Sequence, residues 1–117
     1  MKRLLGICIV CFVLAACAPS VSESEAPTLA REVAHLLEQQ IKVGSLSSAS
    51  WPPSVAALKP QAVYLRAEGL YIKTSSFFTE ERGVFVRNPE SAFSPTHGTD
   101  PSYKLVTDHV FVYRKAG

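Results

Sequence analysis

The sequence predicts a small two-layer α+β domain, in which one N-terminal amphipathic helix packs on a four-stranded, mainly antiparallel sheet. Two patterns indicate this class. Apolar residues recur at helical spacing in residues 28–43, and four β-rich runs follow in residues 62–114. Hydrophobic residues make up 47% of the 117 residues, which is enough for a core and too many for a disordered chain.

The helix is expected over residues 28–43 because its large apolar residues form one stripe. They lie at i, i+4, i+7, i+8 and i+12, and are Leu29, Val33, Leu36, Leu37 and Ile41. Pro27 suits the first turn, and Gly44 suits a C-terminal stop. After a polar stretch, Trp51 is expected either to close an edge of the core or to serve as a ligand platform. A single helical turn is expected next, at 54–58.

Four runs rich in β-branched and aromatic residues predict the strands. They are residues 62–66, 70–74, 84–87 and 109–114. The first two are separated by three residues that end in Gly69, a length and a glycine position typical of a hairpin. Residues 80–83 are expected to form the turn before the third strand, so the sheet has four strands in this interpretation.

The N-terminus has the organisation of an export signal. Lys2 and Arg3 precede a 13-residue apolar stretch at 4–16, which is shorter than the ~20 residues that a membrane-spanning helix needs. A short apolar stretch between basic and small residues predicts a cleaved signal peptide. Removing the leader also removes the two excess cations, so residues 17–117 carry no net side-chain charge.

Leu14-Ala15-Ala16-Cys17 resembles a bacterial lipobox. The resemblance implies that Cys17 receives a diacylglycerol and becomes the first residue of a lipoprotein. It also implies a signal peptide at 1–16. Residues 18–27 are mainly serine, glutamate, alanine and proline and cannot bury enough apolar surface to fold, which predicts a lipidated tether at 17–27 before one small domain at 28–117. Because Ala18 rather than aspartate follows the cysteine, the resemblance favours the outer membrane, facing the periplasm. The alternative is that Cys17 is an ordinary leader residue near another cleavage site.

The composition and motifs exclude several function classes. The net charge of the sequence is only +2. A nucleic-acid binder usually concentrates many more basic residues on one surface, so this class is excluded. Phosphate-loop, dinucleotide and metalloprotease signatures are absent from the sequence, so no cofactor is predicted. His97 and His109 have no fixed spacing to Asp100 or Asp108, and therefore no metal site is predicted either.

The strongest candidate for partner binding is the connection at 74–82. Phe77 and Phe78 cannot both point into a core from an extended segment. An exposed aromatic ring beside charged residues is typical of a protein-binding hot spot, and the charged residues here are Glu80, Glu81 and Arg82. The alternative is a wide turn that folds one phenylalanine under the sheet and leaves the glutamates in solvent.

The long irregular segment at 88–103 adds His97 and Tyr103 as candidate partner-binding residues. His97 and Asp100 have the residue types of a general base and the carboxylate that orients it. Alternatively, Asp100 and Pro101 begin a helical turn over 102–105. No serine lies in a nucleophile-elbow motif, so no catalytic residue is assigned and a non-enzymatic function is expected.

Together these features predict a membrane-anchored protein of the bacterial cell envelope that binds another protein. An inhibitor or immunity-type lipoprotein would fit this description. The alternative is an accessory subunit of an envelope assembly machine, and a small hydrolase using His97 and Asp100 is a third hypothesis. The sequence leaves the oligomeric state open.

Overall fold

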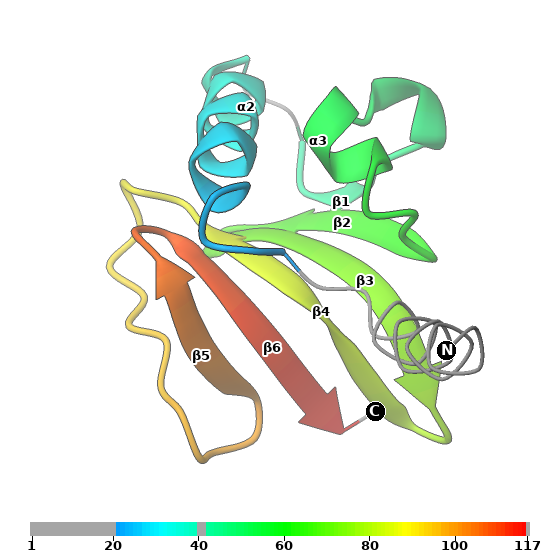
Figure 1. The fold of residues 1–117 in the computed structure, drawn as a ribbon, viewed down its shortest axis with the longest axis vertical. Coiled ribbons are helices and arrows are strands. Elements are labelled where there is room, and N and C mark those ends of the chain that lie inside the picture. Colours follow the sequence, from blue (N-terminus) through cyan, green and yellow to red (C-terminus); the bar gives the residue numbers. More distant parts are fainter. Residues whose placement is uncertain (1–20, 40–41, 117) are drawn as a thin grey trace, which may run out of the picture.

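The computed structural model describes residues 21–39 and 42–116, which form one six-stranded antiparallel sheet and the helices packed on it (Figure 1). The elements are α2 (Ala26–Glu38), β1 (Gly44–Ser45), η1 (Ser48–Ser50), α3 (Pro53–Ala56), β2 (Ala62–Arg66), β3 (Gly69–Phe77), β4 (Glu80–Arg87), β5 (Ser102–Thr107) and β6 (Val110–Ala116). The strand order is β1-β2-β3-β4-β6-β5. The α+β class is therefore confirmed, whereas the prediction of four strands is wrong.

The additional strands lie at the two edges of the sheet. β1 is only two residues long and pairs through Gly44 with Leu65 of β2. β5 pairs with β6 over a segment that was expected to be an irregular loop or a helical turn. The central strands are longer than predicted, because β3 continues to Phe77 and β4 begins at Glu80. The predicted turn at 80–83 is consequently part of β4.

Helix α2 confirms the apolar stripe but has different ends. Ala26, Leu29, Val33 and Leu36 are buried, and Leu37 is only partly buried. The helix ends at Glu38 rather than at residue 43, because the chain must leave it to bring Gly44 into β1. Residues 1–20, including the predicted signal peptide and Cys17, lie outside the described residues, as does Ile41.

The packed chain also begins before the predicted domain boundary at residue 28. Val21 is buried in the same apolar core as the helix, and Ala26 is fully buried at the helix start. Residues 21–27, which were assigned to the tether, therefore include two positions that contribute to the core.

The two faces of the sheet carry different side chains. One face, here called the helix-side face, is aliphatic and packs against α2; its buried residues are Val63, Leu65, Leu70, Ile72, Val84, Val86 and Val110. The other, the aromatic face, carries rings from five strands: Tyr64, Tyr71, Phe85, Tyr103, Phe111 and Tyr113. Side chains alternate between the faces along each strand, so one register produces both cores.

Because residue 83 is glycine, β3 and β4 can approach each other closely next to a shift in their register. The register shifts between Lys73 and Ser75, opposite Gly83. A Cβ atom at Gly83 would lie 2.0 Å from the carbonyl oxygen of Ile72, which is a backbone atom and cannot rotate away. The role of Gly83 is thus close packing inside a strand, not a turn.

Helices α2 and α3 lie toward one end of the sheet in Figure 1, while the β3–β4 hairpin and the end of β6 lie at the other. We call this second region the open end. Glu32 of α2 fixes α3 by accepting hydrogen bonds from the backbone nitrogen of Ser54 (2.9 Å) and from its hydroxyl (2.6 Å). These two bonds lower the pKa of Glu32.

Candidate functional site at the open end of the sheet

The β3–β4 hairpin ends in a loop of two residues, Phe78 and Thr79, because Phe77 pairs directly with Glu80. Phe78 is 90% exposed, and its φ of 56° lies in the left-handed region. Hairpin loops of this length usually place glycine, asparagine or aspartate at such a position. The structure therefore puts a large apolar ring at the tip of the hairpin, in a backbone conformation that suits smaller residues.

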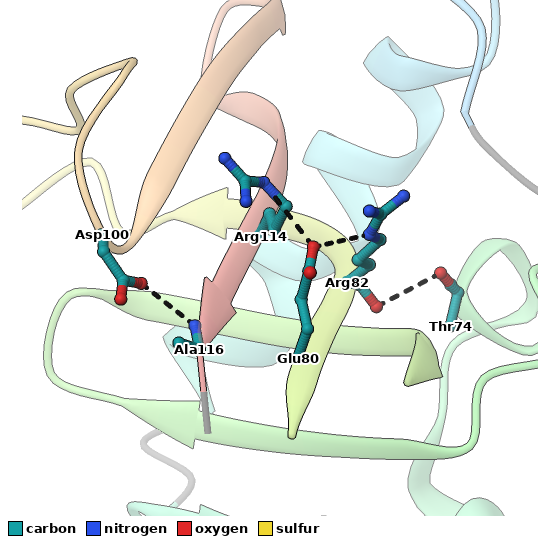
Figure 2. A network of polar contacts seen from close by, with 6 residues as sticks. All are labelled: Thr74, Glu80, Arg82, Asp100, Arg114 and Ala116. Carbon is teal, nitrogen blue, oxygen red and sulfur yellow. Dashed lines mark hydrogen bonds and ion pairs between the residues drawn. The ribbon is translucent and has the colours of Figure 1, made fainter. Parts of the chain in front are cut away.

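Beside the tip, one carboxylate joins two arginines from neighbouring strands. Glu80 Oε2 lies 2.8 Å from Arg82 Nε and 3.6 Å from Arg114 Nε. Figure 2 shows this carboxylate between the two guanidinium groups. Arg82 and Arg114 are also direct partners in the β4–β6 register, and both side chains are more than half exposed.

A cavity of about 270 Å³ adjoins these arginines at the open end. Its lining comes from β4, β5, β6 and the segment before β5, and comprises Arg82, His97, Ser102, Lys104, Val112, Tyr113 and Arg114. Arg114 was not identified from the sequence as a site residue, and neither was Lys104. Both could have been identified if residues 102–107 had been predicted as a strand, because the pairing of β5 with β6 places Lys104 diagonally next to Arg114.

The segment at 88–101 is held against β5 and β6 by hydrogen bonds to the backbone. Tyr103 donates its N–H to Thr96 O (2.8 Å), and Gly98 donates its N–H to the hydroxyl of buried Ser102 (3.1 Å). Asp100 Oδ1 accepts the N–H of Ala116 (3.0 Å), as Figure 2 shows. The expectation that Asp100 begins a helical turn over 102–105 is wrong, because the chain there is β5.

The structure does not assemble the proposed pair of His97 and Asp100. Within the described part of the chain these side chains share no hydrogen bond, and the Asp100 carboxylate is bound to the backbone of β6. His97 instead lines the cavity that holds three cationic side chains. No group of three or more histidine, cysteine, aspartate or glutamate residues within residues 21–39 and 42–116 is arranged to hold a metal ion.

Glu81 and Tyr103, also predicted as partner-binding residues, belong to the aromatic face. Glu81 Oε2 accepts hydrogen bonds from Tyr64 and Tyr113, each at 2.5 Å. Burial alone would raise the pKa of Glu81, but the two phenol hydrogen bonds and the nearby Lys115 and Lys73 lower it below its ordinary value. The carboxylate is therefore held in its charged form.

The remaining rings of the aromatic face pack closely with one another. Tyr71 stacks on Tyr64 with ring centroids 5.0 Å apart, and its hydroxyl lies 2.7 Å from that of Tyr103. Burial and hydrogen bonds raise the pKa of Tyr71, and burial also raises that of Tyr103. A cavity of about 350 Å³ lies beside these hydroxyls, with Lys115 on its wall. Because Tyr71 and Tyr103 are buried, this face resembles a second core more than an exposed binding platform.

A third hollow lies between α2 and the segment around η1 and α3. It measures about 550 Å³, and its wall includes Leu36, Trp51 and the exposed His35. The indole nitrogen of Trp51 donates to Leu46 O (3.2 Å), and the ring packs against the main core. Trp51 therefore closes an edge of the core, as one of the two sequence interpretations expected.

The predicted partner-binding residues thus occupy three places. Arg82 and His97 line the open-end cavity, and Glu80 contacts Arg82 beside it. Phe78 lies at the hairpin tip, and Glu81 and Tyr103 lie on the opposite face. Phe77 is the last residue of β3. Alternation along β4 explains the separation of Glu81 from its two neighbours.

These elements define the molecule as an α+β domain with one open antiparallel sheet. Comparison with protein-family models, with curated proteins and with solved structures found no match. Among the described helices, none has the length and apolar character needed to cross a membrane.

Proposed function

We propose that the chain is a lipid-anchored protein of the bacterial envelope whose domain binds another protein through the tip of the β3–β4 hairpin. The observation that supports this function best is the presentation of Phe78. Its ring is 90% exposed, and its backbone is left-handed. A left-handed conformation costs an ordinary L-residue roughly 1–2 kcal/mol. A side chain retained at this cost in solvent is better explained by recognition than by folding.

The surroundings of Phe78 match the organisation of a protein interface. A hot-spot residue is usually a large side chain that enters a pocket on the partner, surrounded by polar groups. Here Glu80, Arg82 and Arg114 form a fixed charged group on the adjacent strands. The partner expected is a protein with an apolar pocket flanked by charged residues. A lipid anchor would hold the domain on the same surface as such a partner and raise its effective concentration.

Site-specific photo-crosslinking in the intact envelope tests this proposal. A photoreactive residue at position 78 should form a discrete adduct with one protein, and excess unlabelled protein should suppress it. The matched control is the same probe at position 105, because Leu105 is also an exposed apolar residue, 58% exposed, but lies on β5. Adducts of equal intensity from both positions, or none from position 78, would refute the proposal.

Once the partner is identified, Phe78→Asn should weaken its binding by roughly thirtyfold, which corresponds to ~2 kcal/mol for a hot-spot ring. Asparagine tolerates the left-handed backbone, so the melting temperature should change little. Leu105→Ala should leave the affinity unchanged. Binding of Phe78→Asn with wild-type affinity would show that the ring is not the contact.

A further inference from the structure

The cavity at the open end collects positive charge from three neighbouring strands. Arg82 comes from β4, Lys104 from β5 and Arg114 from β6. His97 and the hydroxyl of Ser102 complete its polar lining. The cavity therefore offers cationic and hydroxyl groups that converge on one space of about 270 Å³.

The register places two of these cations directly opposite each other. Arg82 pairs with Arg114, and like charges at opposed positions destabilise a sheet. A single carboxylate, Glu80 Oε2, lies near the Nε atoms of both. Within the described chain, the terminal guanidinium nitrogens of the two arginines have no hydrogen-bond acceptor. The arginines are thus oriented by Glu80 through Nε, while their terminal N–H donors remain available.

The charge balance indicates the kind of group that would complete the site. Arg82, Lys104 and Arg114 contribute +3 and Glu80 contributes −1, which leaves +2 with His97 neutral. The carboxylate of Asp100 is bound to Ala116 N–H and does not line the cavity. A phosphate monoester carries about −1.5 to −2 charge near neutral pH and has three terminal oxygens. A carboxylate would neutralise only half of the excess and has two oxygens for three cations.

We propose that this cavity binds a phosphate monoester group, with Arg82 and Arg114 donating their terminal N–H groups and Lys104 supplying a third cationic contact. Arginine is suited to this role because its planar fork donates two parallel hydrogen bonds to phosphate oxygens. The bound group replaces the missing counter-charge between the opposed arginines. The ligand is either a free phosphate compound or the monoester headgroup of a lipid, since both present the same chemistry.

The test is a titration of the full-length protein in non-ionic detergent at low ionic strength, followed by backbone and arginine Nε chemical shifts. Inorganic phosphate should shift the signals of Arg82, Lys104 and Arg114 saturably, whereas chloride at equal ionic strength should not. Arg114→Gln and Arg82→Gln should each weaken binding by about tenfold, as expected for loss of a charge-assisted hydrogen bond. Arg31→Gln is the matched control, because Arg31 is an exposed arginine on α2, away from this cavity.

Two further variants keep the test decisive if an arginine variant does not fold. Glu80→Gln removes the competing negative charge but keeps a side-chain oxygen that can accept from the arginine Nε groups, so it should tighten phosphate binding by roughly threefold. Lys104→Met should weaken it. Failure of phosphate to saturate, weakening by Glu80→Gln, or equal effects of Arg31→Gln and Arg114→Gln would each overturn the proposal.

Water-soluble dihexanoyl phosphatidic acid separates the two ligand sources. Tighter binding of this compound than of inorganic phosphate would identify a lipid headgroup, whereas equal binding would show that the phosphate group alone is recognised. Dihexanoyl phosphatidylcholine, a phosphodiester with a compensating cation, should bind more weakly than either. Phe78 does not line the cavity, so Phe78→Asn should leave the phosphate affinity unchanged.

Discussion

Glu81 connects three strands of the sheet through one oxygen atom. Tyr64 from β2 and Tyr113 from β6 donate to it on either side, although Glu81 itself belongs to β4. Lys115 lies 5.2 Å from the ring centroids of both Tyr64 and Tyr71, which adds positive charge to the same cluster. The charged carboxylate is therefore part of the packing on the aromatic face, and its protonation should lower the stability of the folded protein.

We predict that Glu81 makes the protein acid-sensitive. Its pKa is lower in the folded protein than in the unfolded chain, where a glutamate titrates near pH ~4.3. Its contribution to stability is complete above that value and is lost as the pH falls through the lower, folded-state pKa. Thermal melts of Glu81→Gln should show a lower melting temperature at neutral pH and a smaller further loss below pH ~4.3 than the wild type.

The control for this experiment is Glu90→Gln, because Glu90 is exposed and its carboxylate makes no hydrogen bond to the described residues. It should behave as the wild type at every pH. If the melting temperature of Glu81→Gln fell below pH ~4.3 as steeply as that of the wild type, the two tyrosines would not be stabilising the charged carboxylate.

The same residue shows where sequence reasoning was limited. Glu80, Glu81 and Arg82 were interpreted as one charged turn, but in β4 they alternate between faces. Their assignment depends on β3 and β4 continuing to Phe77 and Glu80, and on the register shift between Lys73 and Ser75. Neither feature has a local sequence signal, so the sequence could not show that Glu81 lies on the opposite face from Glu80 and Arg82.

At the scale of elements, long segments with regular apolar spacing were predicted correctly, whereas short or polar segments were missed. The stripe of α2 and the strand β2 follow directly from their spacing. β5 was missed because Asp100 and Pro101 suit a helix start and the strand carries polar residues at Ser102 and Lys104. Its pairing with β6 outweighs that local preference, as tertiary context often does. β1 is too short to have a pattern of its own.

We predict that residues of the helix stripe contribute unequally to the stability of the fold according to how deeply they are buried, although their spacing in the sequence makes them look equivalent. Leu29 is 1% exposed, whereas Leu37 is only partly buried at the margin of the core. Leu29→Ala should cost about 2–5 kcal/mol, because it removes a fully packed side chain and leaves a cavity. Leu37→Ala should cost less than half as much. Urea denaturation of both variants measures the difference, and equal losses would contradict the packing of α2 described above.

At the scale of the molecule, one sheet separates two cores of different chemistry. The aliphatic core lies under α2, and the aromatic core lies on the other face with Phe93 from the segment at 88–101 packed against it. The α+β class could be predicted because the helix and the central strands have strong periodicity. The second core could not be predicted, because its rings come from five strands and a loop, and only the fold determines how these strands pair.

The membrane anchor is also a property of the whole molecule, and it remains a prediction from the lipobox resemblance. Cys17→Ser should abolish incorporation of a fatty-acid analogue during metabolic labelling and release the protein from the membrane fraction. Cys11→Ser is the matched control, because Cys11 lies within the predicted leader and should not affect labelling. Equal labelling of Cys17→Ser and the wild type would exclude a lipoprotein.

The division of the sheet into two cores also gives the protein two intrinsic optical probes. Its single tryptophan, Trp51, packs against the aliphatic core, while all four of its tyrosines, Tyr64, Tyr71, Tyr103 and Tyr113, belong to the aromatic core. Indole fluorescence therefore reports on one face and phenol absorbance on the other, with no label added. Coincident transitions of the two signals during unfolding would show that both faces melt as one cooperative unit, whereas separate transitions would reveal which face opens first.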